Sequence, residues 1–287
     1  MPPLPPLHAL RPSHTLPLLA AALLAAVAAL AGCNTGFRAG LSAYEQERYH
    51  TAARAVEPLA ERGHARSQFL LGLLHENGHG VERNLERAAH WYRAAAEQGF
   101  APAQTNLGVL LQTAALAGTD PARAAHWYRR AAEQGHAAAR NNLAMLHLTG
   151  EGVRADPDRA RSLLAQAARD GDANAQYLYG SMLAESGEGE ADFRNAARWY
   201  EKAAQQDHVE AQFALAVMHE SGRGVRVDHA KAFDLYTRAA EAGHAPAEHN
   251  LALLYASVLG SPAPDLPVLE ARQQTRVTVP RLRLDAP

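Results

Sequence analysis

Residues 90–99 read HWYRAAAEQG, and residues 126–135 read HWYRRAAEQG. The two stretches differ at one position and begin 36 residues apart. A fixed period of this length is typical of repeat proteins, in which each repeat is one supersecondary unit. The sequence on both sides of the two stretches keeps the same period.

Five consecutive blocks of 36 residues align without a gap. They are residues 64–99, 100–135, 136–171, 172–207 and 208–243. They open with HARSQFLLGLL, FAPAQTNLGVL, HAAARNNLAML, DANAQYLYGSM and HVEAQFALAVM. A sixth block, residues 244–260, opens with HAPAEHNLALLYA and covers only the first helix of the pattern. The array is therefore expected to end in a half-repeat.

Each block has the pattern of a helical hairpin. Apolar side chains fall at positions 6, 8 and 11 of the block, and a small residue at position 9 lets a neighbouring helix approach closely. Glycines are expected to end the first helix and, in a left-handed conformation, the second helix. The small residues at position 9 include Gly72, Gly108 and Gly180. The loop glycines are Gly78, Gly80, Gly150, Gly152, Gly222 and Gly224, and the glycines after the second helix are Gly99, Gly135, Gly171 and Gly243.

The second helix of each block begins with a capping residue and carries aromatic side chains. An Asn or Asp side chain accepts hydrogen bonds from free N–H groups at a helix start. The predicted caps are Asn84, Asp120, Asp156, Asp192 and Asp228. Trp-Tyr pairs follow in three blocks, and one member of each pair should face the hairpin core, one turn before the small residues. Their tryptophans are Trp91, Trp127 and Trp199.

The outward member of each pair could line a groove together with variable residues of the first helices. These residues are Gln68, Gln104, Arg140, Gln176 and Gln212. A glutamine at such a position more often makes structural hydrogen bonds than binding contacts. Both interpretations stay open at this point.

Each hairpin leaves an apolar face that only the next hairpin can cover, so the array must stack into a solenoid. Residues 39–63 have the pattern of a tetratricopeptide-type hairpin with a turn near Glu47, and we interpret them as the N-terminal cap. Residues 261–287 lose the period and are rich in proline, so we expect them to be extended or disordered. Residues 277–284 could cover the exposed face of the last helix.

The repeat reads A-x-A-Q-x-x-L-G, then G-x-G-V, then A-x-x-W-Y-x-x-A-A-E-Q-G, and resembles the Sel-one-like repeat family, relatives of the tetratricopeptide repeat. The resemblance covers about residues 64–258 and implies an all-α, right-handed α/α solenoid. Two blocks depart from the pattern. Residues 114–117 replace one glycine loop with Ala-Ala-Leu-Ala, and another loop has its glycines shifted to Gly187 and Gly189. We expect reshaped loops there and unchanged stacking.

One stretch suggests catalysis. His75 to His79 match H-E-x-x-H, which in zinc proteases places two histidine ligands and a catalytic glutamate on one helix face. That helix must continue through both histidines, whereas Gly78 and Gly80 are expected to end it. In the other blocks the residues equivalent to His75 are Leu111, His147, Leu183, His219 and Tyr255. The sequence therefore favours a helix end in a scaffold, and we expect no metal, cofactor or catalytic residue.

Five further histidines lie near the block starts and are spaced by the repeat. They are His64, His136, His208, His244 and His249. Adjacent hairpins place equivalent residues about 10 Å apart, too far for shared metal ligation at about 2 Å. We expect exposed or loop histidines. The 28 Lys and Arg against 30 Asp and Glu give a net charge of −2, which does not support nucleic-acid binding.

The first 33 residues have the layout of a lipoprotein signal. Residues 16–32 are uncharged and apolar, and they end at Cys33, the only cysteine of the chain. Leu30-Ala31-Gly32-Cys33 resembles the lipobox of bacterial lipoproteins, in which cleavage between Gly32 and Cys33 precedes lipidation of the cysteine. The resemblance implies a signal peptide over residues 1–32, a tether over residues 33–38, and a place in the bacterial cell envelope. Asn34 favours the outer membrane, facing the periplasm.

The leading hypothesis is a lipid-anchored scaffold whose concave face binds a protein or peptide, in envelope processes or signalling. The alternative is a cell-wall-fragment binder or hydrolase of the secreted Sel-one-like type, although the relatives connected with that role are rich in cysteine. A third hypothesis is an exported effector.

Overall fold

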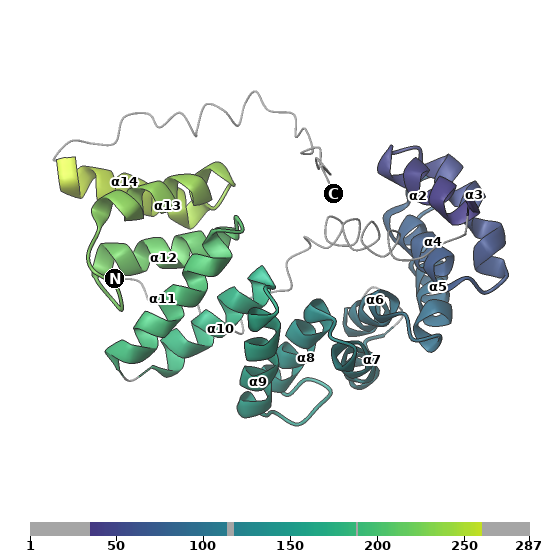
Figure 1. Cartoon of the computed structure of the whole chain (residues 1–287), viewed down its shortest axis with the longest axis horizontal. Helices are drawn as coiled ribbons and strands as arrows, with labels where there is room; N and C mark the ends of the chain where they lie inside the picture. Colours follow the sequence, from purple (N-terminus) through teal and green to yellow (C-terminus); the bar gives the residue numbers. More distant parts are fainter. Residues whose placement is uncertain (1–34, 114–117, 188, 260–287) are drawn as a thin grey trace. The chain divides into compact units, whose positions relative to one another are not determined.

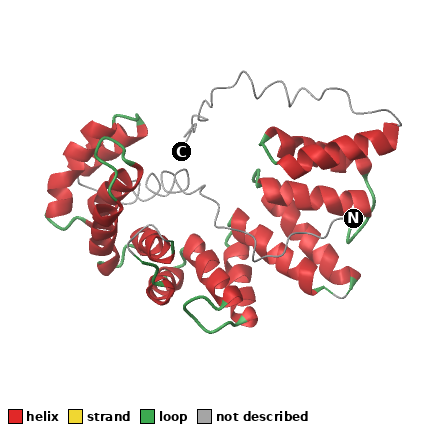
Figure 2. Ribbon diagram, turned by 180° about the vertical axis from the view of Figure 1, so that it is seen from behind, coloured by secondary structure: helices red, strands yellow, loops and turns green. Residues whose placement is uncertain are grey.

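The computed structural model describes residues 35–113, 118–187 and 189–259 (Figure 1). Over these residues the chain forms thirteen α-helices and no strand (Figure 2), which confirms the predicted all-α class. The first hairpins are α2 (Thr35–Glu45), α3 (Tyr49–Glu61), α4 (Ala65–Asn77), α5 (Leu85–Glu97), α6 (Ala101–Gln112) and α7 (Pro121–Glu133). They are followed by α8 (Ala137–Thr149), α9 (Pro157–Arg169), α10 (Ala173–Ser186), α11 (Glu190–Ala204), α12 (Val209–Ser221), α13 (His229–Glu241) and α14 (Ala245–Leu259).

The helices pack in chain order. The chain divides into two compact units, residues 1–175 and 176–287, and the boundary falls inside α10. Consecutive helices pack on one another from α2 through α9 in the first unit and from α11 through α14 in the second unit. Each unit is thus a segment of the right-handed α/α solenoid that the sequence predicts.

Close approach inside each hairpin depends on the small residue of the first helix. Tyr92 of α5 is fully buried and lies over Gly72 of α4, where an added Cβ would come 2.6 Å from the tyrosine ring. Gly108 and Tyr128 repeat this arrangement in α6 and α7. Glycine therefore lowers intrinsic helix propensity at these positions but lets a large ring fill the core of the hairpin.

Most second helices begin where the sequence places their caps. The side chains of four predicted caps accept a hydrogen bond from the N–H group three residues on, and they are Asn84, Asp120, Asp156 and Asp228. The prediction for Asp192 is wrong, because α11 begins at Glu190 with Gly189 as its N-cap. The glycines of this loop are shifted along the chain, so the helix starts earlier and Asp192 lies in its first turn.

Positive-φ residues end the helices. Gly78, Gly150 and Gly222 end three first helices in the left-handed conformation. Glycines with φ between 84° and 96° follow four second helices, and they are Gly99, Gly135, Gly171 and Gly243. In the block 172–207 a non-glycine residue, Asp207, takes this place with φ 59°.

The two ends of the array differ from the repeats. Helices α2 and α3 form the hairpin that the sequence predicts as the N-terminal cap, with Glu47 at φ 58° in its turn. Residues 35–38 are not a tether as predicted, because they form the first turn of α2 and Phe37 is buried there. The predictions for residues 1–32, Cys33 and residues 261–287 lie outside the described residues. None of the helices in the described part of the chain is long and apolar enough to span a membrane.

Candidate functional site

The H-E-x-x-H stretch does not form a zinc-binding helix. Helix α4 ends at Asn77, and Gly78 turns the chain with φ 71°. His75 lies inside the helix, where its Nδ1 donates to the carbonyl oxygen of Glu82 at 3.3 Å. His79 lies beyond the helix and stacks on Tyr49, with 4.2 Å between the ring centroids. Among residues 35–113, 118–187 and 189–259, no cluster of His, Cys, Asp and Glu side chains is placed to hold a metal ion.

Glu76, which would be the catalytic residue in a zinc protease, instead forms a hydrogen bond in the core of its hairpin. Its carboxylate accepts a hydrogen bond from the hydroxyl of Tyr92. Burial raises the pKa of Glu76, and the hydrogen bond from Tyr92 and the charge of Arg83 oppose that rise. In the next hairpin the hydroxyl of Tyr128 donates to Gln112 Oε1 at 3.0 Å, so a neutral amide accepts the equivalent hydrogen bond there.

We expect Glu76→Gln to make stability less dependent on pH. The raised pKa means that the folded state favours the protonated carboxyl, so this group contributes most stability below its ordinary pKa of 4.5. That contribution is lost as the pH rises from 4.5 to the raised pKa of the folded state. The variant cannot ionise, so it should exceed the parent protein in stability at pH 7 and match it near pH 4. Urea unfolding at both pH values measures the difference.

The matched control is Glu97→Gln, which removes one exposed carboxylate from α5. If both variants change the pH profile equally, the effect reflects net charge alone, and the burial of Glu76 does not cause it.

The glutamines at position 5 of the blocks are structural. Gln68 is buried and its Nε2 donates to the carbonyl oxygen of Ala60 at 3.0 Å, while Gln98 Nε2 donates to Gln68 Oε1 at 2.7 Å. These two hydrogen bonds therefore link the second helix of one hairpin to both helices of the next. Buried equivalents with the same backbone or amide contacts are Gln104, Gln176 and Gln212. The groove-lining interpretation is wrong for these four residues, because their side chains are buried between helices.

Arg140 takes the glutamine position in the third block and pairs with Asp170. Its side chain is largely buried while that of Asp170 is exposed, so the pair lies at the edge of the hairpin junction. Arg140 therefore also holds neighbouring helices together and does not line a groove.

Three of the histidines at the block starts cap the first helices, whereas His136 makes no cap and contacts Thr105 Oγ1 at 2.9 Å. Nδ1 of His64 accepts from the N–H of Ser67 at 3.3 Å, and the ring lies 5.4 Å from that of Phe37. Burial lowers the pKa of His64, which favours the neutral ring that a cap acceptor requires. His208 and His244 cap their helices in the same way. These three are half-buried and lie just before their helices, so of the expected exposed or loop positions they take the second.

Each glycine loop docks on the preceding repeat. A Cβ at Gly80 would overlap the backbone of Tyr49 and His50 at the start of α3. Gly152 meets Pro121 and Ala122 in the same way, and Gly224 meets Phe193 and Arg194. In these three loops the second glycine therefore lies against the backbone of the preceding repeat, where a side chain would not fit.

The residue between the two loop glycines also contacts the preceding repeat. His79 stacks on Tyr49, and the guanidinium of Arg223 lies 4.0 Å from the ring of Phe193. Sequence reasoning missed this contact. A signal was present, because an aromatic residue precedes each of these side chains by 30 positions.

In each Trp-Tyr pair the tyrosine faces the hairpin core, as the spacing predicts. Tyr92 and Tyr128 are fully buried, whereas Trp91 and Trp199 are half-buried. Lys202 Nζ lies 4.0 Å over the ring of Trp199, a cation–π arrangement that occupies one face of the indole.

Position 10 of the first helices carries a partly exposed apolar side chain in four of the six blocks, which we call the position-10 row, whereas Leu73 is buried at this position and Ser181 is polar. Val109 and Met145 occupy this row in the first unit and are half-buried. Val217 and Leu253 occupy it in the second unit, where Leu253 is 55% exposed. Stacked first helices repeat this position once per hairpin, so each unit presents a discontinuous apolar line between polar side chains.

The family model of the Sel1 repeat matches residues 65–100, 101–136, 137–172, 173–208 and 209–244. The chain belongs to the Sel1 repeat family. These matched segments are the five blocks of the sequence, displaced by one residue. No curated protein sequence matches the chain significantly.

Two crystal structures of Sel1 repeat proteins resemble the chain. One is a protective antigen present in uropathogenic Escherichia coli strains that displays an SLR fold, with 29% identity and a TM-score of 0.73 over 85% of this chain and 53% of that chain. This chain therefore spans about half the length of that protein. The other is a Sel1 repeat protein from Oxalobacter formigenes, with 29% identity and a TM-score of 0.72 over 86% of this chain and 100% of that chain.

Proposed function

We propose that this Sel1 repeat protein is a non-catalytic scaffold that binds a protein or peptide on its first-helix face and is held at the bacterial envelope by lipid on Cys33. Sel1 repeat proteins bind other proteins, and their fold supports a role as an interaction scaffold. We assign the binding face from the partly exposed apolar side chains of the position-10 row.

The row has the chemistry of a peptide-binding surface. Val109 and Met145 keep part of their apolar surface in contact with water although they lie on well-packed helices. Contact with a partner would remove that surface from water, which contributes about 25 cal/mol per Å². Methionine suits such a surface because its flexible thioether adapts to different partners.

The anchor is supported by the sequence around Cys33. The only cysteine follows an apolar leader and small residues, and the helical array begins at Thr35, directly after it. Several acyl chains on this residue would make membrane attachment stable, because each buried CH₂ contributes about 0.8 kcal/mol. The array would then be held close to the membrane surface.

Photocrosslinking in intact cells tests the binding face. A photoreactive phenylalanine analogue at Val109 or Met145 is expected to capture the same partner, because both positions lie in one row of the first unit. The matched control places the analogue at Arg129, which is exposed on the second helix α7. Capture from Arg129 at a similar level, or no capture from Val109 and Met145, would contradict the proposal.

Lipid attachment to Cys33 is measured in the same strains by labelling with a radioactive fatty acid. Cys33→Ser should abolish the label and move the protein from the membrane fraction to the soluble fraction. If the label persists in Cys33→Ser, the anchoring part of the proposal is wrong while the crosslinking result stands on its own.

A further inference from the structure

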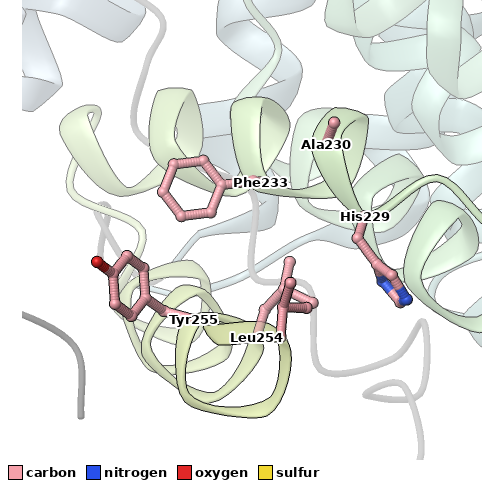
Figure 3. A pocket seen from close by; sticks show the side chains of 6 residues that line it. His229, Ala230, Phe233, Leu254 and Tyr255 are labelled. Atoms are coloured by element: carbon pink, nitrogen blue, oxygen red, sulfur yellow. The ribbon is translucent and has the colours of Figure 1, made fainter. Parts of the chain in front are cut away.

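An open groove lies between the last two helices of the array, α13 and α14. The groove has a volume of about 230 Å³ and is lined by His229, Ala230 and Phe233 of α13 and by Leu254, Tyr255 and Val258 of α14. Figure 3 shows Phe233 and Tyr255 reaching into the space between the two helices. Their ring centroids are 6.3 Å apart, so the groove has an aromatic wall.

Exposed apolar surface concentrates around this groove. Among the described residues, the large apolar side chains that are exposed are Val227, Phe233, Leu253 and Val258, with exposed fractions between 37% and 56%. Phe233 and Val258 line the groove, whereas Val227 lies in the loop just before α13 and Leu253 belongs to the position-10 row. Exposed apolar side chains gathered in one groove mark a site that something covers.

Earlier repeats show what covers the equivalent surface. The residues that precede His229 and Ala230 by one period are Phe193 and Arg194, and the loop around Gly224 packs against them. The loop around Gly152 covers Pro121 and Ala122 in the same way. In each case the covering segment is the stretch of chain that follows the next first helix.

The chain after α14 begins at this groove. Val258 occupies the position of Gly222, so α14 continues past the point where α12 ends, and Gly260 occupies the position of Gly224. Val258 itself lines the groove. Residues 261–269, SPAPDLPVL, follow Gly260 in the sequence.

The composition of this segment matches the groove. Proline-rich segments dock on aromatic-lined grooves because their extended conformation is already restricted before binding. Pro264 and Pro267 are three residues apart, which places them on the same side of a polyproline helix. Leu266, Val268 and Leu269 are the large apolar side chains of this segment apart from its prolines.

We propose that residues 261–269 fold back into the groove between α13 and α14 and cap the C-terminal end of the array. Leu266, Val268 and Leu269 pack on Phe233, Tyr255 and Val258, in the place of the missing loop and second helix. A tethered segment acts at an effective concentration in the millimolar range, so it outcompetes a second copy of the chain at micromolar protein. Terminal repeats require such a cap to stay soluble.

Hydrogen exchange on the full chain tests the cap. The triple variant Leu266→Asp, Val268→Asp, Leu269→Asp should speed amide exchange in α13 and α14 about ten-fold, because it opens the groove to water. The matched control is Val277→Asp, Val279→Asp, Leu282→Asp, which makes the same changes further along the chain and should leave exchange in these helices unchanged. Circular dichroism checks that both variants keep their helices.

Three outcomes would overturn the proposal. Unchanged exchange in the first triple variant means that residues 261–269 do not cover the groove. An equal or larger effect of the control means that residues 277–284 cover it instead. Protection of α13 and α14 that rises with protein concentration in the parent chain means that a second copy is the occupant.

Discussion

Replacing Gly80 with alanine is expected to lower the free energy of unfolding by about 4 kcal/mol, the largest loss for so small a change. Two effects add at this residue. Its φ of 68° is unfavourable for any residue with a Cβ, and the new methyl group would overlap the backbone of Tyr49 and His50. A backbone cannot move aside as a flexible side chain can, so α4 and its loop would have to separate from α3.

The control for Gly80→Ala lies in the same repeat. Gly99 has a φ of 88°, but an added Cβ there meets nothing within 4 Å. Gly99→Ala should therefore cost only about 1 to 2 kcal/mol, the conformational part of the effect. Urea unfolding of the two variants measures both. Equal losses would show that the loop does not dock tightly on the preceding hairpin.

Tyr128→Ala is expected to lower the free energy of unfolding by about 4 kcal/mol, the usual loss when a buried aromatic side chain is truncated. The ring of Tyr128 is fully buried and lies against Gly108, so no nearby side chain is positioned to fill the space. The cavity would open where α6 and α7 pack together. The loss should appear as a lower urea midpoint for the first unit.

Tyr128→Phe separates the ring from its hydroxyl. It keeps the packing on Gly108 and removes the hydrogen bonds of the hydroxyl with Gln112 and Asn142, so we expect a loss of about 1 kcal/mol in the free energy of unfolding. If Tyr128→Phe costs as much as Tyr128→Ala, the hydroxyl contact and not the ring holds the hairpin together.

The repeat and its helices could be predicted from the sequence because each relies on local chemistry. Asn84 and Asp156 cap helices with their own side chains, and Gly78 ends a helix by its own conformational freedom. The burial of Tyr92 follows from spacing along one helix. Such features need no knowledge of the neighbouring repeat.

The missed features depend on contacts between repeats or on small shifts in a loop. The stack of His79 on Tyr49 joins residues that are 30 positions apart, and the repeat pattern alone does not pair them. The misplaced cap at Asp192 arose because a fixed period was applied to a loop whose glycines had moved. For the binding face, sequence reasoning left open whether the glutamines line a groove, and it did not consider the half-buried side chains of Val109 and Met145.

The glutamine bridges between hairpins have a consequence for how the protein can change in length. Gln68 reaches Ala60 by the same hydrogen bond with which Gln104 reaches Ala96. Deleting residues 64–99 would bring Gln104 to Ala60 with the same geometry, and duplicating the block would create another equivalent bridge. Junctions of this kind, with glutamine at position 5, are interchangeable, so gene duplication or loss can lengthen or shorten the array by whole hairpins and keep this bridging hydrogen bond.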